Sequence, residues 1–339
     1  MSTTLLLVAL GLGLTAVSVF LWAVSLRLGL RWAKVEGVTK GRVVLATALV
    51  VAFQMAVVIA SCYLSPPTES HALAYSLIKA VLVVLFTCGV IVWVFRVRFR
   101  RSLLVWLPTF ALSLLLCCFH SFVLTPFVYE SFASAGNSMA PTLRGCHWEG
   151  VCPVCGKPNY CSPVEPSAFC PPGELMICDE FHTCQVPMRN KTVQPADRFI
   201  VAKFLAPRRW DLVVFKCPDN PSVPFVRRVV GLPGETIHIE DGAVWINGEK
   251  LTPPDSIRGL KYLSGEEIVR EPRQDLGLRA RGTAENPAVL GEDEYFVLGD
   301  FSERSMDSRF WGPGAVPAAN LIGVVTHIGW PLARWRVFR

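Results

Sequence analysis

Charged residues are missing from four long stretches of the first 128 residues, apart from Lys79 in the third. Hydrophobic residues make up 52% of the chain, and their excess lies in these stretches. Each stretch is long enough to cross the hydrocarbon core of a bilayer, which excludes a chain that is soluble throughout. We therefore predict that residues 1–128 form four transmembrane helices, namely Leu5–Leu26, Val43–Leu64, Tyr75–Phe95 and Leu103–Val128.

Three further patterns are absent after Val128. There is no long amphipathic helical pattern, so a helical soluble domain is excluded. No stripe of basic residues with interleaved aromatic residues occurs, which excludes a nucleic-acid partner. No Gly-Lys-Ser or Gly-Lys-Thr follows the glycine-containing blocks, which excludes a phosphate-binding loop. The net charge of +6 comes largely from the loops between the predicted helices.

These loops differ in charge, and the difference predicts their orientation. The second loop, residues 65–74, has one Glu and no Lys or Arg, whereas the first and third loops are basic. Because basic loops stay in the cytoplasm, we expect a multi-pass protein of the cytoplasmic membrane. Its N-terminus and all residues after Val128 are then extracytoplasmic. The basic residues are Arg27, Arg31, Lys34, Lys40 and Arg42 in the first loop, and Arg96, Arg98, Arg100 and Arg101 in the third.

Residues 129–339 consist of short β-branched or aromatic runs bounded by Gly, Pro, Asn or Asp. Two dipeptides, Asp241-Gly242 and Asn247-Gly248, are typical of tight hairpin turns. The predicted fold is a multi-span α-helical membrane region followed by a mainly antiparallel β domain. The expected strands are 199–202, 212–215, 225–230, 236–239, 243–246, 295–298 and 322–328.

Two segments interrupt the predicted β domain. Residues 146–195 are rich in Cys and Pro and show no convincing strand pattern, so we interpret them as a Cys-rich, zinc-ribbon-like insertion. Residues 253–287 are charged and contain Pro and Gly, which favours an exposed excursion or a small subdomain.

Four separate blocks of the β domain carry the clearest pattern. The first, Gly136 to Leu143, reads Gly-Asn-Ser-Met-Ala-Pro-Thr-Leu and follows the last apolar stretch closely. The others are residues 197–201 with 210–215, residues 227–235, and residues 299–312. In sequence and order these blocks resemble bacterial type I signal peptidases. Those proteins are membrane-bound serine endopeptidases that remove leader peptides from exported proteins.

The resemblance implies that residues 129–339 are a catalytic β domain in which Ser138 is the nucleophile. The Ser138 backbone N–H would be the first donor to the oxyanion. The family's general base is a lysine whose pKa is lowered by burial, and Ser305 matches the serine that positions it. In this chain Arg227 occupies the position of that lysine.

Arg227 is a poor substitute for a lysine base. A guanidinium has a pKa above roughly 12 and stays protonated in proteins, so it cannot accept the proton of Ser138. The nearby alternatives are Lys203, Lys216 and His238, and nothing in the sequence brings any of them to the serine.

Further residues acquire roles from the same resemblance. Asp300, Asp307 and Arg309 are expected to support the site, the last two as a buried ion pair. The family binds its substrate as an extended peptide added to an edge strand. The corresponding substrate-binding residues are Ser134, Ala135, Gly136 and Asn137.

Seven of the twelve cysteines lie between positions 146 and 184. Cys152 and Cys155 form a Cys-x-x-Cys motif, which is one half of a zinc ribbon. Cys178 and Cys184 would complete a tetrahedral site, with His182 as an alternate ligand. Disulfides are the competing interpretation, because the extracytoplasmic side is oxidising. Seven is an odd number, so at least one thiol stays unpaired or pairs elsewhere.

The sequence therefore predicts a membrane-bound endopeptidase of the signal peptidase I type that removes leader peptides after small residues. The alternative is a pseudoprotease that binds leader peptides or membrane-protein tails without cleaving them, because Arg227 replaces the lysine. The expected partners are leader peptides and the lipid bilayer, with no nucleic acid. Catalysis needs no cofactor, and a structural zinc remains one of the two readings of the cysteines.

Overall fold

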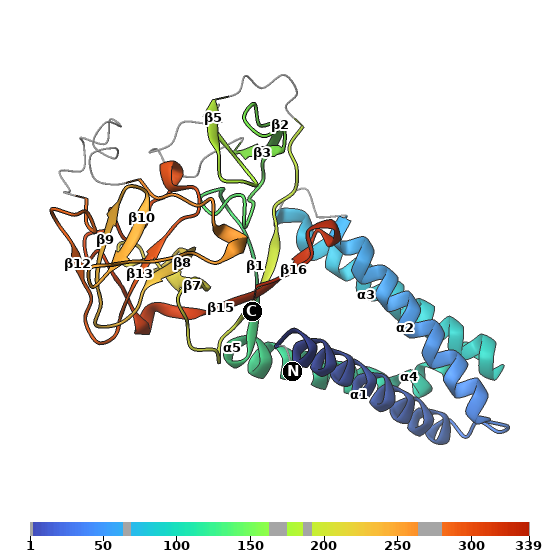
Figure 1. Ribbon diagram of the computed structural model, residues 1–339. Coiled ribbons are helices and arrows are strands. Elements are labelled where there is room, and N and C mark those ends of the chain that lie inside the picture. The colour runs from blue at the N-terminus through green and yellow to red at the C-terminus, as the bar shows by residue number, and fades with distance from the viewer. Residues whose placement is uncertain (1–2, 64–68, 163–174, 186–191, 264–279, 339) are drawn as a thin grey trace. The chain divides into compact units, whose positions relative to one another are not determined.

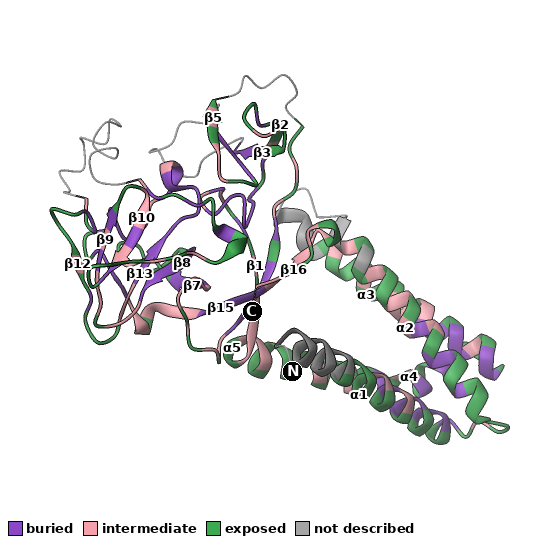
Figure 2. Cartoon of the chain, in the orientation of Figure 1, coloured by how far each residue is buried: buried purple, intermediate pink, exposed green. Residues whose placement is uncertain are grey.

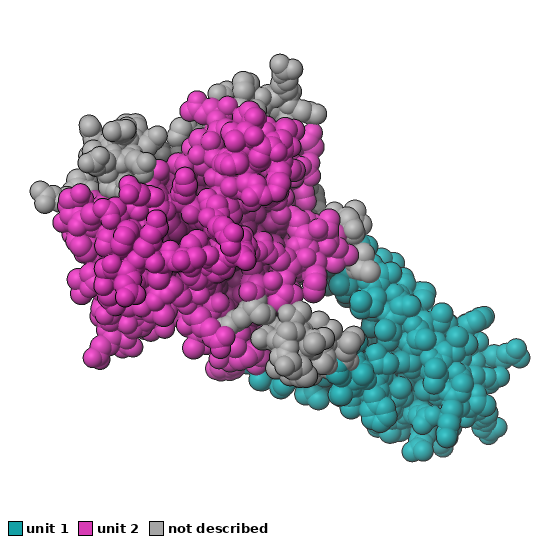
Figure 3. Space-filling view, viewed as in Figure 1, with its two compact units in different colours: residues 1–123 teal, residues 124–339 magenta. Residues whose placement is uncertain are grey.

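The computed structural model describes residues 3–63, 69–162, 175–185, 192–263 and 280–338. The chain divides into two compact units, residues 1–123 and residues 124–339, which are coloured separately in Figure 3. Each unit has a hydrophobic core of its own. The division falls close to residue 128, where the membrane region was expected to end.

The first unit is helical and covers the four predicted apolar stretches (Figure 1). After the last long helix, a π-helix (His120–Leu124) and the short helix α5 (Thr125–Phe127) lead into the second unit. Among the described residues, three helical stretches are long and apolar enough to cross a membrane: Lys40–Val58, Ala74–Phe95 and Phe99–Phe127. The long helices are α1 (Thr3–Trp32), α2 (Lys40–Tyr63), α3 (Glu69–Phe95) and α4 (Phe99–Phe119).

The core of this unit lies at the end that carries the two basic loops (Figure 2). Leu30 and Val43, which flank the first loop, belong to the same buried cluster as Phe95 beside the third. Gly29 allows α1 to approach α4 closely, because a Cβ there would lie 2.1 Å from the carbonyl oxygen of Val105. Both basic loops thus lie at one end of the helical unit, as the charge pattern requires.

The second unit is built on an eight-stranded antiparallel sheet in the order β1-β6-β15-β7-β8-β13-β14, with β16 paired to β15. Its strands are β1 (Tyr129–Ala133), β6 (Arg198–Ala202), β7 (Leu212–Lys216), β8 (Pro224–Gly231), β13 (Glu294–Leu298), β14 (Val316–Pro317), β15 (Leu321–Trp330) and β16 (Arg336–Val337). Alternate residues of β7 enter different cores, since Leu212 packs on one face and Val213 on the other. Burial on both faces explains the continuous apolar runs of the central strands.

A second sheet has the order β11-β10-β9-β12. The predicted turns Asp241-Gly242 and Asn247-Gly248 join its hairpins, and all four residues have φ between +51° and +85°. Positive φ at both central residues defines the type I′ turn, which suits the twist of a hairpin. The strands are β9 (Thr236–Glu240), β10 (Ala243–Ile246), β11 (Glu249–Lys250) and β12 (Ala288–Val289).

The segment 253–287, for which we predicted an exposed excursion or a small subdomain, has both exposed and buried residues in its described part. Its first part contains a 3-10 turn, Asp255–Ile257, and buries Ile257, Leu260 and Tyr262 in the core beneath the second sheet. These three apolar side chains are separated by polar residues, so no strand or helix period revealed them. Residues 264–279 of this segment lie outside the described residues.

The Cys-rich insertion differs from its prediction, because it contains four strands in the order β2-β3-β4-β5. The strands are too short for an alternating pattern to stand out, and cysteines occupy several of their buried positions. They are β2 (Trp148–Val151), β3 (Pro158–Cys161), β4 (Leu175–Cys178) and β5 (Thr183–Gln185). Each neighbouring pair is antiparallel, so the insertion is a small meander.

Candidate active site

Ser138 lies in a turn that contacts the block beginning at Gly299. The carbonyl oxygen of Ser138 accepts a hydrogen bond of 3.0 Å from the N–H of Phe301. A Cβ at Gly299 would lie 2.7 Å from that oxygen and 2.1 Å from the Oγ of Ser305. Only glycine fits between the two, so this close approach brings Ser138 and Ser305 to the same place.

The side chain of Asn137 holds this turn. Its buried side-chain amide donates to the carbonyl of Cys146 and to the Oγ of Ser162, each at 2.8 Å. Its carbonyl oxygen accepts from the N–H of Gly145 at 2.9 Å. All three bonds reach the start of the Cys-rich insertion or residues within it, so Asn137 joins the nucleophile turn to the insertion.

The other predicted substrate-binding residues follow strand β1. Ser134 is buried, and its hydroxyl donates to the carbonyl of Gly136 at 3.0 Å. The Ser134 N–H bonds to the Asp197 carbonyl, which continues the pairing of β1 with β6. Ala135 is exposed. Strand β1 is the terminal strand of the sheet among the described strands, so its outer edge offers backbone groups to an added peptide strand.

Arg227 is buried on β8 and points its guanidinium at main-chain carbonyls. Nε and one terminal nitrogen donate to the carbonyl of Met306 at 3.0 and 2.6 Å, and the other donates to Val226 at 2.6 Å. The guanidinium also lies 5.1 Å from the ring centre of Phe225. Burial lowers the pKa of Arg227 to about 10, which leaves the side chain protonated at neutral pH.

Ser305 is fully buried next to Met306, and its Oγ has no hydrogen-bond partner among the described residues. An unpaired buried hydroxyl is costly, so such a group calls for an explanation. Ser305 and Arg227 lie near each other, because the Arg227 guanidinium donates to the carbonyl of Met306, the residue after Ser305.

The alternative bases lie elsewhere. Lys203 is paired with Glu130 at 2.8 Å. His238 is on β9 of the second sheet, where it stacks on Trp245. Lys216 is exposed at the end of β7.

Two buried arginine–aspartate pairs surround the site. Asp307 and Arg309 form the expected pair through two bonds of 2.8 Å, and Asp307 also accepts from the Gly299 N–H at 3.0 Å. Burial alone would raise the pKa of Asp307, but Arg309 and the Gly299 N–H outweigh it and lower the pKa. The pair therefore fixes the glycine that touches Ser138.

Asp300 belongs to a second network that sequence reasoning did not complete. It is paired with Arg228 through bonds of 2.7 and 2.5 Å and accepts a bond from the Thr142 hydroxyl. Burial alone would lower the pKa of Arg228, but Asp300 raises it. Because Thr142 lies four residues after Ser138, this network anchors the far side of the nucleophile turn.

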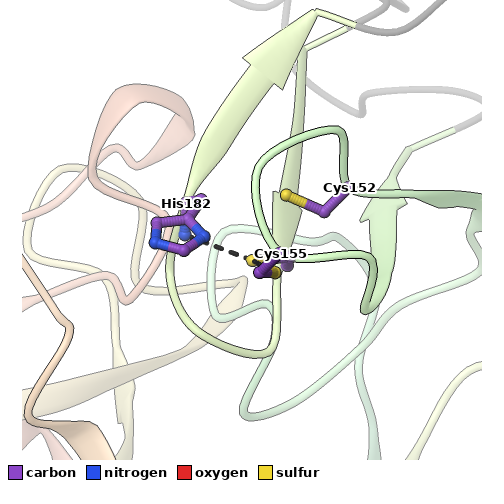
Figure 4. A group of neighbouring side chains, drawn as sticks. Cys152, Cys155 and His182 are labelled. Carbon is purple, nitrogen blue, oxygen red and sulfur yellow. Dashed lines mark hydrogen bonds between the residues drawn. The ribbon is translucent and has the colours of Figure 1, made fainter.

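The predicted metal ligands come from two hairpins of the insertion. Cys152 and Cys155 lie in the turn between β2 and β3, and Cys178 and His182 lie at the turn between β4 and β5. Figure 4 shows the His182 ring beside Cys152 and Cys155. One ligand atom from each of the four residues lies within 4.8 Å of all the others. Within the described part of the insertion, Cys152, Cys155, Cys178 and Cys184 form no disulfide.

Comparison of the sequence with known proteins identifies the family of this chain. A family model described as "Signal peptidase, peptidase S26" matches residues 176–330. Signal peptidase I V of Bacillus subtilis (strain 168) is 34% identical over 142 residues, which cover 40% of this chain and 77% of that protein. The chain belongs to the signal peptidase I family. The protein is therefore a member of a family of serine-type peptidases, and its apolar helices associate it with a membrane.

Other members of the signal peptidase I family match in the same way. Signal peptidase I of Leptolyngbya laminosa is 37% identical over 160 residues, which cover 42% of this chain and 64% of that protein. A signal peptidase I from Enterococcus faecalis V583, known from its crystal structure, shares 29% sequence identity with this chain, and the TM-score is 0.26. The match covers 36% of this chain and 98% of the Enterococcus chain. The match thus spans between about half and three quarters of the first three curated relatives, at 64%, 77% and 52% of their lengths.

Proposed function

We propose that this member of the signal peptidase I family is a leader-peptide endopeptidase that acts outside the cytoplasmic membrane, with Ser138 as nucleophile. The observation that carries the proposal is the contact of Ser138 with Gly299 and, through it, with Ser305. Three blocks that are far apart in the sequence meet there, with Arg227 one residue away at Met306. A turn with no chemical task would not need this convergence.

The geometry suggests how the substrate binds and reacts. A leader peptide would add as an extended strand to the outer edge of β1, which directs it toward Ser138. The Ser138 Oγ attacks the scissile carbonyl, and the bond to the leaving amine breaks to give an acyl-enzyme, which water then hydrolyses. The Ser138 N–H donates to no backbone carbonyl among the described residues, so it is available to the oxyanion.

Proton removal from Ser138 limits this reaction. Arg227 remains protonated and is occupied by the carbonyls of Met306 and Val226, so it cannot accept the proton. Water or hydroxide must accept it instead, which makes hydrolysis slow at neutral pH and faster as the pH rises. The buried positive charge of Arg227 still favours negative charge on the attacking oxygen.

The decisive experiment restores the amine. Arg227→Lys should raise cleavage of a leader-bearing substrate at least about a hundredfold, because removal of a general base typically costs roughly 10²–10⁴-fold. A lysine there is buried enough for its pKa to fall, and the Oγ of Ser305 is available to orient it. Purified protein in detergent would be assayed over a pH series, and the gain should follow a rising limb at the lysine pKa.

The matched control is Ser138→Ala in both backgrounds, which should abolish cleavage. An Arg227→Lys protein that folds normally yet stays inactive would contradict the proposal. Fast, Ser138-dependent cleavage by the natural protein would show that another residue is the base.

Binding without cleavage is the second candidate function. The observation that favours it is the engagement of three N–H groups of Arg227 by carbonyl oxygens, which suits a fixed structural role. In that case the natural protein and Ser138→Ala should bind a leader peptide with equal affinity, and neither should release a product. Product released only by the natural protein would rule this function out.

A further inference from the structure

We propose that Cys152, Cys155, Cys178 and His182 bind one zinc ion. We further propose that this ion holds the β2–β5 sheet against the turn that carries Ser138. The first part rests on the geometry of the two hairpin turns. The second rests on contacts that join the sheet to residues 137–144.

The first turn has the backbone of a metal-binding knuckle. The Cys152 N–H donates to the Lys157 carbonyl at 2.8 Å, and the Gly156 N–H donates to the Cys152 carbonyl at 2.9 Å. Gly156 has φ of +71°, a conformation that glycine adopts without strain. This compact turn presents the sulfurs of Cys152 and Cys155 on one side.

The second turn repeats the arrangement with a histidine. The Phe181 N–H donates to the Cys178 carbonyl at 2.8 Å, and Phe181 has φ of +61°. The His182 N–H donates to the Cys178 sulfur at 3.3 Å, which holds the imidazole-bearing residue beside this sulfur. The His182 Nδ1 is buried and has no hydrogen-bond partner among the described residues. A metal ion would satisfy this nitrogen.

The spacing of the ligand atoms fits a tetrahedral ion better than a disulfide. The sulfurs of Cys155 and Cys178 are 3.6 Å apart. With Zn–S bonds of about 2.3 Å, two sulfurs of a tetrahedron lie roughly 3.8 Å apart, whereas a disulfide needs about 2.05 Å. Three thiolates and one imidazole are a ligand set typical of structural zinc.

The same geometry replaces Cys184 by His182 as the fourth ligand. Cys184 lies on strand β5 rather than in the turn, and its sulfur accepts from the side-chain amide of Asn159 at 3.4 Å. Its sulfur also contacts Cys152, but Cys184 is not one of the four residues whose ligand atoms lie within 4.8 Å of one another, so Cys184→Ser is the variant that tests its role.

The second hairpin turn is attached to the nucleophile turn by both polar and apolar contacts. Asp179, next to Cys178, accepts from Arg144 at 2.8 Å and from the Tyr160 hydroxyl at 3.0 Å. On the apolar side, Ile177 packs with Ala140 and Phe301 in one buried cluster. Ala140 is two residues after Ser138, so a shift of the β4–β5 turn would be transmitted to the nucleophile.

A metal analysis of the full-length protein tests the ligand set. Purified from cells supplied with zinc, the natural protein and Cys184→Ser should each contain about one zinc per chain. Cys152→Ser, Cys178→Ser and His182→Ala should retain at least about tenfold less, whereas His182→Cys should keep the ion. Replacement of zinc by Co²⁺ should give the visible absorption of a tetrahedral thiolate site in the natural protein.

Three results would overturn the assignment. A natural protein without zinc, with disulfides at these positions by mass spectrometry, would establish the competing chemistry. Zinc lost from Cys184→Ser but retained by His182→Ala would assign the fourth ligand to Cys184. A natural protein that neither contains zinc nor takes up Co²⁺ would exclude the site even if the variants failed to fold.

Hydrogen exchange tests the link to the nucleophile. The backbone amide hydrogens of residues 136–144 should exchange at least about tenfold faster in Cys152→Ser than in Cys184→Ser. Those of the central strands β7 and β8 should stay protected in both variants. This readout does not depend on whether the protein cleaves peptides. Equal exchange of residues 136–144 in a metal-free variant and in Cys184→Ser would show that the zinc does not support the turn.

Discussion

At the scale of single residues, the buried arginines near Ser138 are stabilised in two ways. Arg228 and Arg309 each hydrogen-bond to an aspartate, whereas the hydrogen bonds described for Arg227 go to carbonyl oxygens. A carboxylate offsets the cost of burying a cation by full charge, and carbonyls offset it by dipoles alone. This difference explains why burial lowers the pKa of Arg227 while Asp300 raises that of Arg228.

Removal of one partner of the Asp307–Arg309 pair should be strongly destabilising. Asp307→Asn leaves Arg309 charged in a site without solvent, and loss of one member of a buried pair costs roughly 3–5 kcal/mol. Thermal unfolding in detergent would measure the loss. The exposed pair of Asp255 and Arg258 supplies the control, since Asp255→Asn should leave the unfolding temperature unchanged.

The same pair predicts a pH dependence with a definite sign. Burial by itself would raise the pKa of Asp307, but Arg309 lowers this pKa by more than burial raises it. The pKa in the folded state is therefore below the ordinary value of about 3.9. Its contribution to stability is complete above that ordinary value and is lost as the pH falls toward the lowered one. Unfolding temperatures between pH 5 and pH 3 should therefore fall more steeply for the natural protein than for Asp307→Asn. Parallel curves would contradict the assignment.

Sequence reasoning identified Asp300 as a supporting residue but not Arg228 and Thr142, which bind it. Asp300 lies 72 positions from Arg228 and 158 from Thr142, and no local pattern reports such distant pairs. The resemblance to signal peptidases pointed to Ser138, Arg227 and Ser305 because whole blocks matched. It did not reveal that the Asn137 amide donates to Cys146 and Ser162, because these bonds also join residues that are distant in the sequence.

At the scale of secondary-structure elements, the crossing of α1 and α4 depends on one small residue. A methyl group at Gly29 would meet the backbone of α4 at Val105, which cannot move as a flexible side chain can. Gly29→Ala should therefore destabilise the helical unit by roughly 1–3 kcal/mol, although alanine is the better helix former. Gly89 in α3 has open space around it, so Gly89→Ala should be neutral or slightly stabilising. Unfolding temperatures in detergent would compare the two variants, and a lower value for Gly89→Ala would contradict this account.

Elements that are long or deeply buried were predicted from the sequence, and short strands were not. Strands β6, β7, β8, β13 and β15 of the main sheet were predicted because buried strands form continuous apolar runs, as in Leu212–Lys216. The other three strands of that sheet, β1, β14 and β16, were not predicted. The helices were predicted from length and lack of charge. The strands of the insertion were missed because each has four residues or fewer and its core includes Cys161 and Cys178. Cysteines in a short segment indicate cross-links or metal ligands before they indicate strands.

At the scale of the whole molecule, the arrangement of charge predicts which side each unit faces. The loops 33–39 and 96–98 lie at one end of the helical unit, and these loops together with the adjoining helix ends carry its excess of basic residues. Two reporters would be compared at each position: a fluorescent protein that is active in the cytoplasm and an alkaline phosphatase that is active after export. After Gly37 only the fluorescent protein should be active. After Arg339 only the alkaline phosphatase should be active. The opposite pattern would exclude a role in leader-peptide cleavage outside the membrane.

The Cys-rich insertion leaves and rejoins the chain at neighbouring points. His147 and Gln194 exchange two backbone hydrogen bonds, of 3.2 and 2.7 Å, and the Asp197 N–H donates to the Arg144 carbonyl at 2.8 Å. The closure of a loop of about 46 residues costs roughly 3 kcal/mol of chain entropy. The three backbone hydrogen bonds at the base of the insertion offset this cost, so a metal ion needs to order only the interior of a closed loop. Loss of the metal ion should therefore increase the conformational entropy of the insertion and leave the eight-stranded sheet intact.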